Sequence, residues 1–279
     1  MLVELHCHSN YSERIKVKVE GINSPAEIMK HAKRLGIGAV AITDHDVFKA
    51  HKVVGASAKK YGVLHIPSEE VDKSEGHVLA IGISEWIKPH MDVRETIDQI
   101  HSQGAIAIAA HPFDINDDGI KEGARFCDAM EIFNCLNLDR IANIKGRKFA
   151  QKNEIPGVAG SDAHMLDMMG CGLNQIDADD VDGIVDALKK GKAGIATSKY
   201  IPISVIREWS LLRLKASYDQ IVDYIENNYS WPKKPVSKKL LSLVNHNSGS
   251  VENIFKLITY ISLATAVSYS AIRSNNIFE

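Results

Sequence analysis

The sequence contains few cysteines: there are four among 279 residues, at positions 7, 127, 135 and 171, and none forms a CxxC pair. Thiols scattered in this way argue against a disulfide framework and are typical of a reduced chain. The first residues also lack the basic segment and long apolar run of a secretory leader, and residues 2–5 have a strand-like pattern instead. We therefore expect a cytoplasmic protein.

An excess of charge of one sign is also missing, because 33 lysines and arginines oppose 35 aspartates and glutamates. The net charge of −2 gives the chain no general electrostatic reason to bind nucleic acid or an anionic membrane. One stretch, residues 254–272, is fairly apolar, but Lys256 and several serines and threonines interrupt it. This composition favours a buried or partner-facing helix over a membrane span.

Short apolar segments alternate with helical patterns from the start of the chain to about residue 200. This rhythm is typical of repeated βα units with a mostly parallel sheet. The predicted strands are residues 2–8, 39–43, 63–66, 77–83, 105–110, 129–133, 157–160 and, as a late candidate, 194–197. The first predicted helix starts at the Ser24-Pro25-Ala26-Glu27 cap and stops at Gly36, and others lie at 48–61, 93–103, 140–153 and 179–190.

The alternation stops near Pro202, and the rest of the chain has mainly helical patterns with a break at residues 231–235. We therefore predict an α/β domain over residues 1–200 and an appended helical region over residues 201–279. These C-terminal helices could shape the mouth of a site or join copies of the chain into a homo-oligomer.

Histidines and carboxylates gather at the ends of the predicted strands. His6 and His8 are two residues apart on one strand, so their side chains point the same way. Other strand ends carry further groups of the same kind: Asp44, His45, Asp46, Glu69, Glu70, His77, His111, Asp162 and His164. If these ionisable groups gather at one edge of the sheet, each unpaired buried charge would destabilise the fold by several kcal/mol. Bound cations would remove that cost.

These motifs resemble those of the polymerase and histidinol phosphatase (PHP) family over roughly residues 1–200. The matching motifs are His6-Cys7-His8, Thr43-Asp44-His45, Glu70, His77, His111-Pro112 and Ser161-Asp162-Ala163-His164. The resemblance implies a distorted TIM-like (β/α)7 barrel with about seven strands and a site for three metal ions. It also implies metal-dependent hydrolysis of phosphate esters.

The resemblance further implies which residues hold each ion. The first ion would be held by His6, His8, Glu70 and Asp162. Glu70 would bridge to a second ion held by His77 and His111, and the third ion would be held by Glu13, His45 and His164. From the residues alone, either Glu69 or Glu70 could be the bridging carboxylate, and Glu70 aligns better because it directly precedes apolar Val71.

A ligand set of imidazoles and carboxylates favours zinc, with manganese or iron as alternatives, over calcium or magnesium. We expect two or three divalent ions that activate a hydroxide for attack on a small phosphorylated metabolite or nucleotide. The residues predicted to act in catalysis are Asp44, His45 and Glu70. Asp44 or Asp46 could orient His45 or move protons, and Asp44 could equally be only a structural partner of this histidine. Asn134 could bind substrate or be an ordinary loop amide.

Three other functions fit parts of the sequence. An amidohydrolase-like enzyme could use the same metal site, and a non-catalytic binding module could keep the metals for structure. A nuclease acting on single strands could use the tail lysines, Lys233, Lys234, Lys238 and Lys239, to contact phosphates. We favour the small-molecule phosphoesterase, with no membrane partner.

Overall fold

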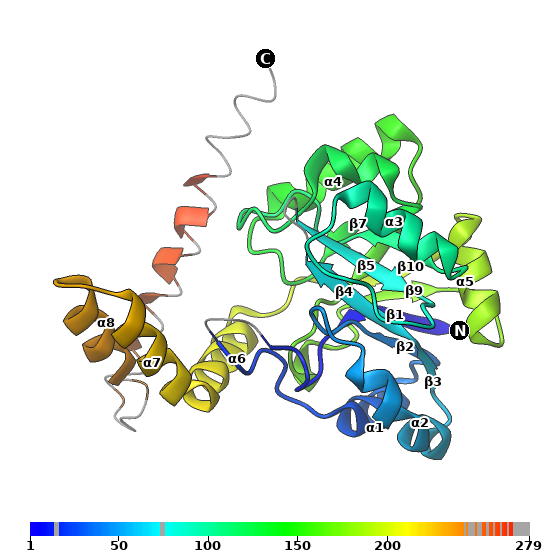
Figure 1. Ribbon diagram of the computed structural model, residues 1–279. Helices are drawn as coiled ribbons and strands as arrows, with labels where there is room; N and C mark the ends of the chain where they lie inside the picture. The colour runs from blue at the N-terminus through cyan, green and yellow to red at the C-terminus, as the bar shows by residue number, and fades with distance from the viewer. Residues whose placement is uncertain are drawn as a thin grey trace.

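The computed structural model describes residues 1–13, 17–72 and 76–242, with single positions and short pieces between 244 and 269. In this part of the chain, two five-stranded sheets form the centre (Figure 1). The first has the order β10-β9-β1-β2-β3 and consists of β1 (Leu2–Cys7), β2 (Ala39–Ile42), β3 (Leu64–Ile66), β9 (Gly172–Gln175) and β10 (Gly194–Ser198). The second runs from β4 to β8 and consists of β4 (Ser68–Asp72), β5 (His77–Ile81), β6 (Ile106–Ala109), β7 (Ala129–Asn134) and β8 (Gly157–Gly160).

Parallel and antiparallel pairs occur in both sheets. β1, β2 and β3 pair in parallel, as do β6, β7 and β8. β9 is antiparallel to β1 and β10, and β5 is antiparallel to β4 and β6. The α/β class is therefore confirmed, but the sheets are less parallel than expected, and the described strands do not close into a (β/α)7 barrel.

Two isolated bridges join the sheets at the ends of their strands. His45, just after β2, pairs with Glu70 of β4, and Cys7 of β1 pairs with Ala163, just after β8. A shared core also connects the sheets, because one buried apolar cluster includes Leu5 of the first sheet, Leu79 of the second and Ile184 of the helix α5. These contacts fix the strand ends of the two sheets relative to each other.

Helices surround the sheets: α1 (Pro25–Leu35), α2 (Lys49–Tyr61), α3 (Val93–Ser102), α4 (Arg140–Asn153) and α5 (Val181–Lys189). Figure 1 shows α1 and α2 beside β2 and β3, and α3 and α4 beside the second sheet. The predicted start of α1 is confirmed, since Ser24 and Glu27 form a capping box. Its end is confirmed at Gly36, which has a φ of 71°. Two short 3₁₀ helices, Lys121–Phe126 and Leu166–Met168, complete this part.

Three helices follow residue 200: α6 (Ile203–Ala216), α7 (Tyr218–Asn228) and α8 (Lys233–Ser242). α6 packs on the α/β part, because Ile206 and Trp209 belong to the same buried cluster as Ile42 of β2. α7 and α8 share a small cluster of their own, and Figure 1 shows them away from the strands. The division into domains 1–200 and 201–279 stays a prediction.

Of the helix expected over residues 254–272, the structure describes short pieces only, and residues 270–279 lie outside the described residues. In the described part of the chain, no helix combines the length and apolar character needed to cross a membrane.

Candidate metal centre

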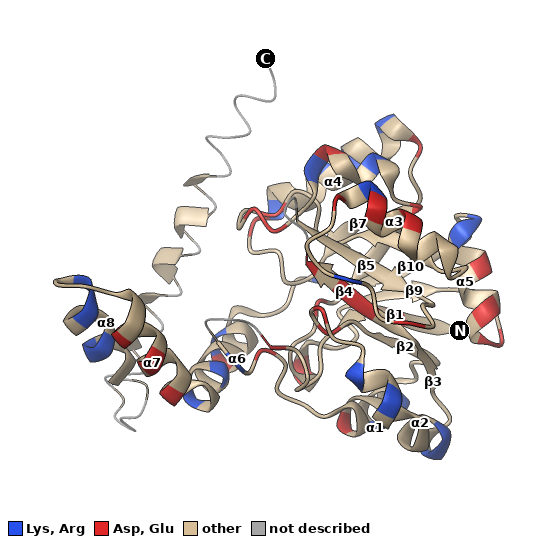
Figure 2. Ribbon diagram, viewed as in Figure 1, with Lys and Arg blue, Asp and Glu red and all other residues tan. Residues whose placement is uncertain are grey.

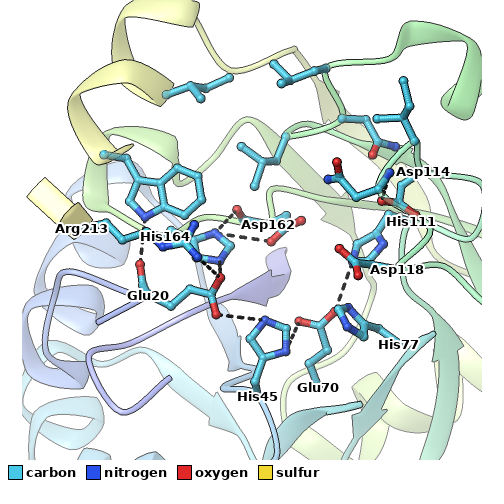
Figure 3. A pocket seen from close by; sticks show the side chains of 17 residues that line it. Glu20, His45, Glu70, His77, His111, Asp114, Asp118, Asp162, His164 and Arg213 are labelled. Atoms are coloured by element: carbon cyan, nitrogen blue, oxygen red, sulfur yellow. Dashed lines mark hydrogen bonds and ion pairs between the residues drawn. The ribbon is translucent and has the colours of Figure 1, made fainter. Parts of the chain in front are cut away.

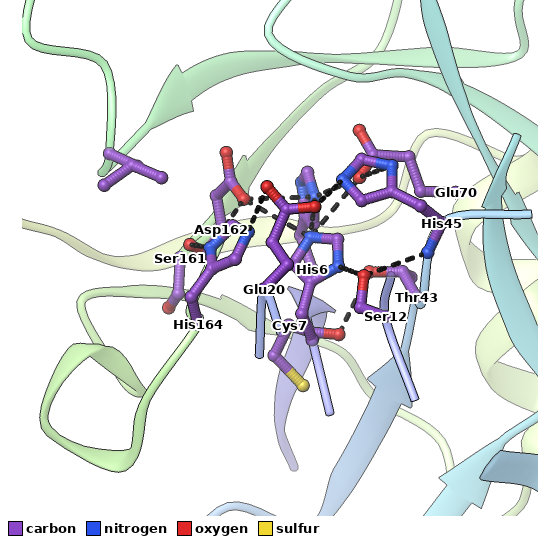
Figure 4. Close-up of polar contacts among 12 residues, drawn as sticks. His6, Cys7, Ser12, Glu20, Thr43, His45, Glu70, Ser161, Asp162 and His164 are labelled. Atoms are coloured by element: carbon purple, nitrogen blue, oxygen red, sulfur yellow. Dashed lines mark hydrogen bonds and ion pairs between the residues drawn. The ribbon is translucent and has the colours of Figure 1, made fainter. Parts of the chain in front are cut away.

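The side chains of His6 on β1, Glu70 on β4 and Asp162 after β8 point toward one another (Figure 4), and His8 lies beside His6. The Nε2 atoms of His6 and His8 are 3.2 Å apart, and each lies 3.3 Å from Oε2 of Glu70. Oδ1 of Asp162 lies 3.5 Å from His6 Nε2 and 3.4 Å from His8 Nε2. Tetrahedral ligands at about 2.0–2.2 Å from a zinc ion stand about 3.4 Å from each other. His6, His8 and Glu70 therefore have the spacing of a metal-ligand set, and Asp162 lies at the same distance from both histidines as a further ligand would.

Glu70 faces a second pair of histidines with its other oxygen. Oε1 of Glu70 lies 2.9 Å from Nδ1 of His77 and 3.2 Å from Nε2 of His111. Successive residues of a strand point to opposite faces, and neighbouring Glu69 accepts a hydrogen bond from the backbone of Ile87 at 2.6 Å. Of the two carboxylates that the sequence left open, Glu70 is the one placed to bridge two ions.

The third group of candidate ligands consists of His45, His164 and a glutamate, and the glutamate differs from the predicted one. His45 and His164 lie here as expected, with their Nε2 atoms 3.6 and 4.0 Å from the carboxylate of Glu20. Glu13 has an exposed side chain, whereas Glu20 is 5% exposed. The geometry therefore contradicts the choice of Glu13 as the third ligand.

The physical reason is the path of the loop after β1. The chain returns to Ser12, whose carbonyl accepts a hydrogen bond from the Glu20 backbone at 3.2 Å. The indole of Trp209 on α6 donates to the Glu20 carbonyl at 2.8 Å. Sequence reasoning missed Glu20 because its position depends on a helix about 190 residues away, and no local motif marks it.

Two further carboxylates hold the histidine rings, and both were missed from the sequence. Glu131 on β7 lies 2.8 Å from Nδ1 of His6. Asp72 at the end of β4 lies 3.0 Å from Nδ1 of His45 and 3.2 Å from Nε2 of His77. Carboxylates in such positions fix the orientation and tautomer of metal-binding histidines. For Glu131, the available signal was one glutamate within the otherwise apolar residues 129–133.

Asn134 and Gly160 complete the surroundings of Glu131. Asn134 donates to Oε2 of Glu131 at 2.9 Å and to Asp162 at 3.2 Å, so this amide does lie at the site. A Cβ atom on Gly160 would stand 1.7 Å from Oε1 of Glu131 and 3.1 Å from Cβ of His6. A side chain at position 160 would therefore displace the carboxylate that orients His6.

Asp44 does not reach the three groups. Its two oxygens accept hydrogen bonds from the backbone and hydroxyl of Ser9, each at 2.6 Å. These bonds fix the turn that follows His8. The predicted catalytic role of Asp44 is therefore not supported by the geometry, which favours the structural alternative.

Several known proteins are similar to parts of this chain. Residues 140–193 match the PHP_C family, described as PHP-associated. The uncharacterized protein MJ1587 of Methanocaldococcus jannaschii is 31% identical over 159 residues, which are 51% of this chain and 87% of that protein. The chain belongs to the PHP family. A second uncharacterized protein of this organism, MJ0417, is 28% identical over 177 residues, 60% of the PHP chain and 66% of that protein.

A solved structure is similar in fold. It is a two-domain protein from Bacteroides vulgatus described as containing a predicted PHP-like metal-dependent phosphoesterase. The TM-score is 0.57 at 17% identity, over 75% of the PHP chain and 69% of the other chain. This likeness supports the α/β architecture of the PHP chain.

The buried charges of the PHP site suit a cation. Burial lowers the pKa of His6, but the carboxylates of Asp162 and Glu131 raise it well above its ordinary value. Burial lowers the pKa of His111 too, but its hydrogen bond to Glu70 and nearby carboxylates raise it to about 9. Without metal, these imidazoles are protonated, and they would have to release the proton in order to bind a metal ion. Among the described residues, Nδ1 of His111 also has no hydrogen-bond partner despite its burial.

The three groups form one side of a cavity of about 320 Å³ (Figure 3). Leu136, Leu138, Ile206 and Trp209 contribute apolar lining, and Asn116 and Asn137 contribute amides. This volume is at the lower end of the range for small-molecule sites, about 300–1,000 Å³. The arrangement can hold divalent cations beside a space that fits a small organic molecule.

Proposed function

We propose that the PHP protein hydrolyses phosphate esters of small metabolites or nucleotides with two or three divalent ions, zinc, manganese or iron. The observation that carries the proposal is the spacing of the His6 and His8 Nε2 atoms, which lie 3.2–3.5 Å from each other and from carboxylate oxygens of Glu70 and Asp162. Support also comes from Glu70, whose second oxygen faces His77 and His111. Ions at these groups would lower the pKa of water and neutralise charge on the phosphate.

The side chains themselves hold protons in defined places. His164 has its Nδ1 atom 2.9 Å from the backbone carbonyl of Asp162, so Nδ1–H donates there and the lone pair of Nε2 faces Glu20. Burial, together with His8, lowers the pKa of His164 to about 3, which keeps this ring neutral. A neutral imidazole with a free Nε2 lone pair is the form that binds a metal.

The first test replaces ligands of the first group. We expect His8→Ala to lower metal content and to reduce turnover of phosphate esters by at least about a hundredfold, because a donor atom is lost. Asp162→Asn is an independent test of the same group from the far end of the chain. The measurements are metal content by elemental analysis and phosphate release from sugar phosphates, amino-alcohol phosphates, nucleotides and oligonucleotides.

His101→Ala is the matched control, because this imidazole is exposed and pairs with Asp128 on the outside of the fold. The control should keep both metal and turnover. Wild-type metal content and turnover in His8→Ala would remove the proposed site. Turnover of carboxamides or lactones without any phosphate ester would favour the amidohydrolase-like alternative.

The nuclease alternative gains no specific support. Of the four tail lysines, Lys234 and Lys238 pair with Glu226 within the helical region. These pairs reduce the positive charge available to a phosphate backbone. Salt-sensitive binding of a single-stranded oligonucleotide would be the result in its favour.

A further inference from the structure

Arg213 on α6 is the one lysine or arginine among the described residues that line the cavity. Figure 3 shows its side chain beside Glu20, next to the third group of ligands. The remaining charged lining is acidic or imidazole: Glu20, Glu70, Asp114, Asp118, Asp162, His45, His77, His111 and His164. An anionic substrate that enters this space meets one permanently cationic side chain.

The guanidinium of Arg213 is held in place by two contacts. The Cζ atom of Arg213 lies 4.9 Å from the centre of the Trp209 ring, and its Nη2 atom lies 3.3 Å from Oε1 of Glu20. Trp209 is itself fixed, because its ring lies 4.6 Å from that of His164 and its N–H donates to the Glu20 carbonyl. A guanidinium held in this way loses less conformational freedom when it binds a ligand.

We propose that Arg213 binds an oxygen of the substrate's phosphate group and so makes the enzyme prefer phosphate monoesters to diesters. The inference rests on the proposed function and names its substrate class. A monoester has three non-bridging oxygens and a diester has two. The monoester therefore offers the guanidinium one more acceptor oxygen and, when fully ionised, one more negative charge than a diester does.

The rest of the cavity agrees with a small organic group on that phosphate. Leu136, Leu138 and Ile206 add apolar lining to that of the Trp209 ring. Figure 2 shows most other lysines and arginines on surrounding helices such as α1, α2 and α8. The chain of a nucleic acid would need positive charge along a path, whereas a single arginine lines this cavity among the described residues. The favoured substrate is a monoester with a compact, apolar or planar organic part.

The test measures ligand binding to metal-loaded protein, so it does not depend on turnover. The probes are inorganic phosphate, which has spare oxygens, and dimethyl phosphate, which has two non-bridging oxygens. The variants are Arg213→Met and Arg213→Lys, and the control is Lys215→Met, which removes an exposed cation from the same helix. Affinities come from calorimetry, metal content from elemental analysis, and the KM for 4-nitrophenyl phosphate from steady-state kinetics.

Wild type should bind phosphate more tightly than dimethyl phosphate. Arg213→Met should weaken phosphate binding and raise KM by about ten- to a hundredfold, the worth of a hydrogen bond to a charged group. Its affinity for dimethyl phosphate should change little. Arg213→Lys should fall between wild type and Arg213→Met, because lysine keeps the charge and loses the fork. Lys215→Met should match wild type.

Equal phosphate affinity in wild type and Arg213→Met, at equal metal content, would overturn the role of Arg213 and leave the proposed function standing. The inference would also be overturned if Arg213→Met lost metal but bound phosphate normally after metal was added back. Arg213 would then serve to hold Glu20 in place. If wild type binds no phosphate and hydrolyses no ester, the proposed function fails and the inference fails with it.

Discussion

Glu4 shows how far burial changes a single residue of this protein. The side chain is fully buried on β1, accepts a hydrogen bond from the Ser161 hydroxyl at 2.5 Å and another from the Gly170 backbone at 3.2 Å. Burial raises the pKa of Glu4 from 4.5 to about 7, although these hydrogen bonds oppose the shift. The folded protein therefore keeps a proton on Glu4 at a pH where the unfolded chain has released it.

This shift gives a direction to the pH dependence of stability. Between pH 4.5 and about 7 the folded state binds more protons at Glu4 than the unfolded state does. The stability that Glu4 contributes is therefore present below pH 4.5 and is lost as pH rises to about 7. The loss is on the order of 3 kcal/mol. Glu4→Gln, which cannot ionise, should remove that part of the decline.

The measurement is the free energy of unfolding of metal-free protein across this pH range, by denaturant titration. Glu95→Gln, at an exposed position on α3, is the control and should keep the wild-type curve. Parallel curves for wild type and Glu4→Gln would show that Glu4 does not titrate as described.

Residue types near strand ends were enough to predict which side chains of the candidate site lie close together. His6, His8, Glu70 and Asp162 come together because strands end at shared edges, which a pattern of apolar segments reveals. Glu131 and Glu20 could not be found in this way. Glu131 lies inside an apolar strand, and Glu20 depends on long-range contacts with Ser12 and Trp209.

At the scale of elements, the strands that sequence patterns missed are those with unusual compositions. β4 has the sequence Ser-Glu-Glu-Val-Asp, in which three carboxylates replace the apolar residues of a typical strand. It is stable because Glu70 and Asp72 face histidines, while Glu69 bonds to the backbone of Ile87. β9 begins at Gly172 in the glycine-rich segment Gly170-Cys171-Gly172, which lacks the apolar residues of a typical strand. The carboxylates that β4 contributes to the candidate site therefore remove the apolar pattern by which a strand is predicted.

The helix α6 is an element whose anchor can be tested by a small change. Trp209→Phe keeps an aromatic ring against His164 but removes the N–H that donates to the Glu20 carbonyl. We expect the free energy of unfolding to fall by about 1 kcal/mol, the usual worth of one hydrogen bond. We also expect weaker metal binding at the third group, because the Glu20 loop loses its tie to α6.

Denaturant titration and the ratio of bound metal to protein measure these two effects. Trp231→Phe is the control, since Trp231 is 84% exposed and far along the chain from α6. Full metal content in Trp209→Phe at limiting metal concentration would show that α6 does not hold the Glu20 loop in place.

At the scale of the whole molecule, the sequence predicted the α/β class and the helices that follow residue 200. The expected (β/α)7 barrel is not closed in the described strands, and strand count could not predict this because closure depends on which strands pair. Here β9 inserts between β10 and β1, and β4 starts the second sheet. Both β9 and β4 pair antiparallel with their neighbours, whereas alternating strands and helices predict parallel pairing.

The predicted boundary at residue 200 can be tested by shortening the chain at two places. A cut after residue 200 removes α6, whose Ile206 and Trp209 are buried against the α/β part. A cut after residue 217 keeps α6 and Ser217, whose hydroxyl accepts a hydrogen bond from the Val19 backbone at 2.9 Å. The boundary that matters for stability should therefore lie after α6.

We expect residues 1–217 to fold and to bind the same amount of metal as the full chain. Residues 1–200 should lose more than about 3–5 kcal/mol, the cost of deleting one buried tryptophan side chain, because Ile206 is deleted as well. The measurements are the midpoint of thermal unfolding and metal content, with the full chain as the reference. A 1–200 fragment with full-length stability and metal would contradict this boundary, since α6 would then be an appendage. Loss of metal in 1–217 would instead place α7 and α8 among the supports of the site.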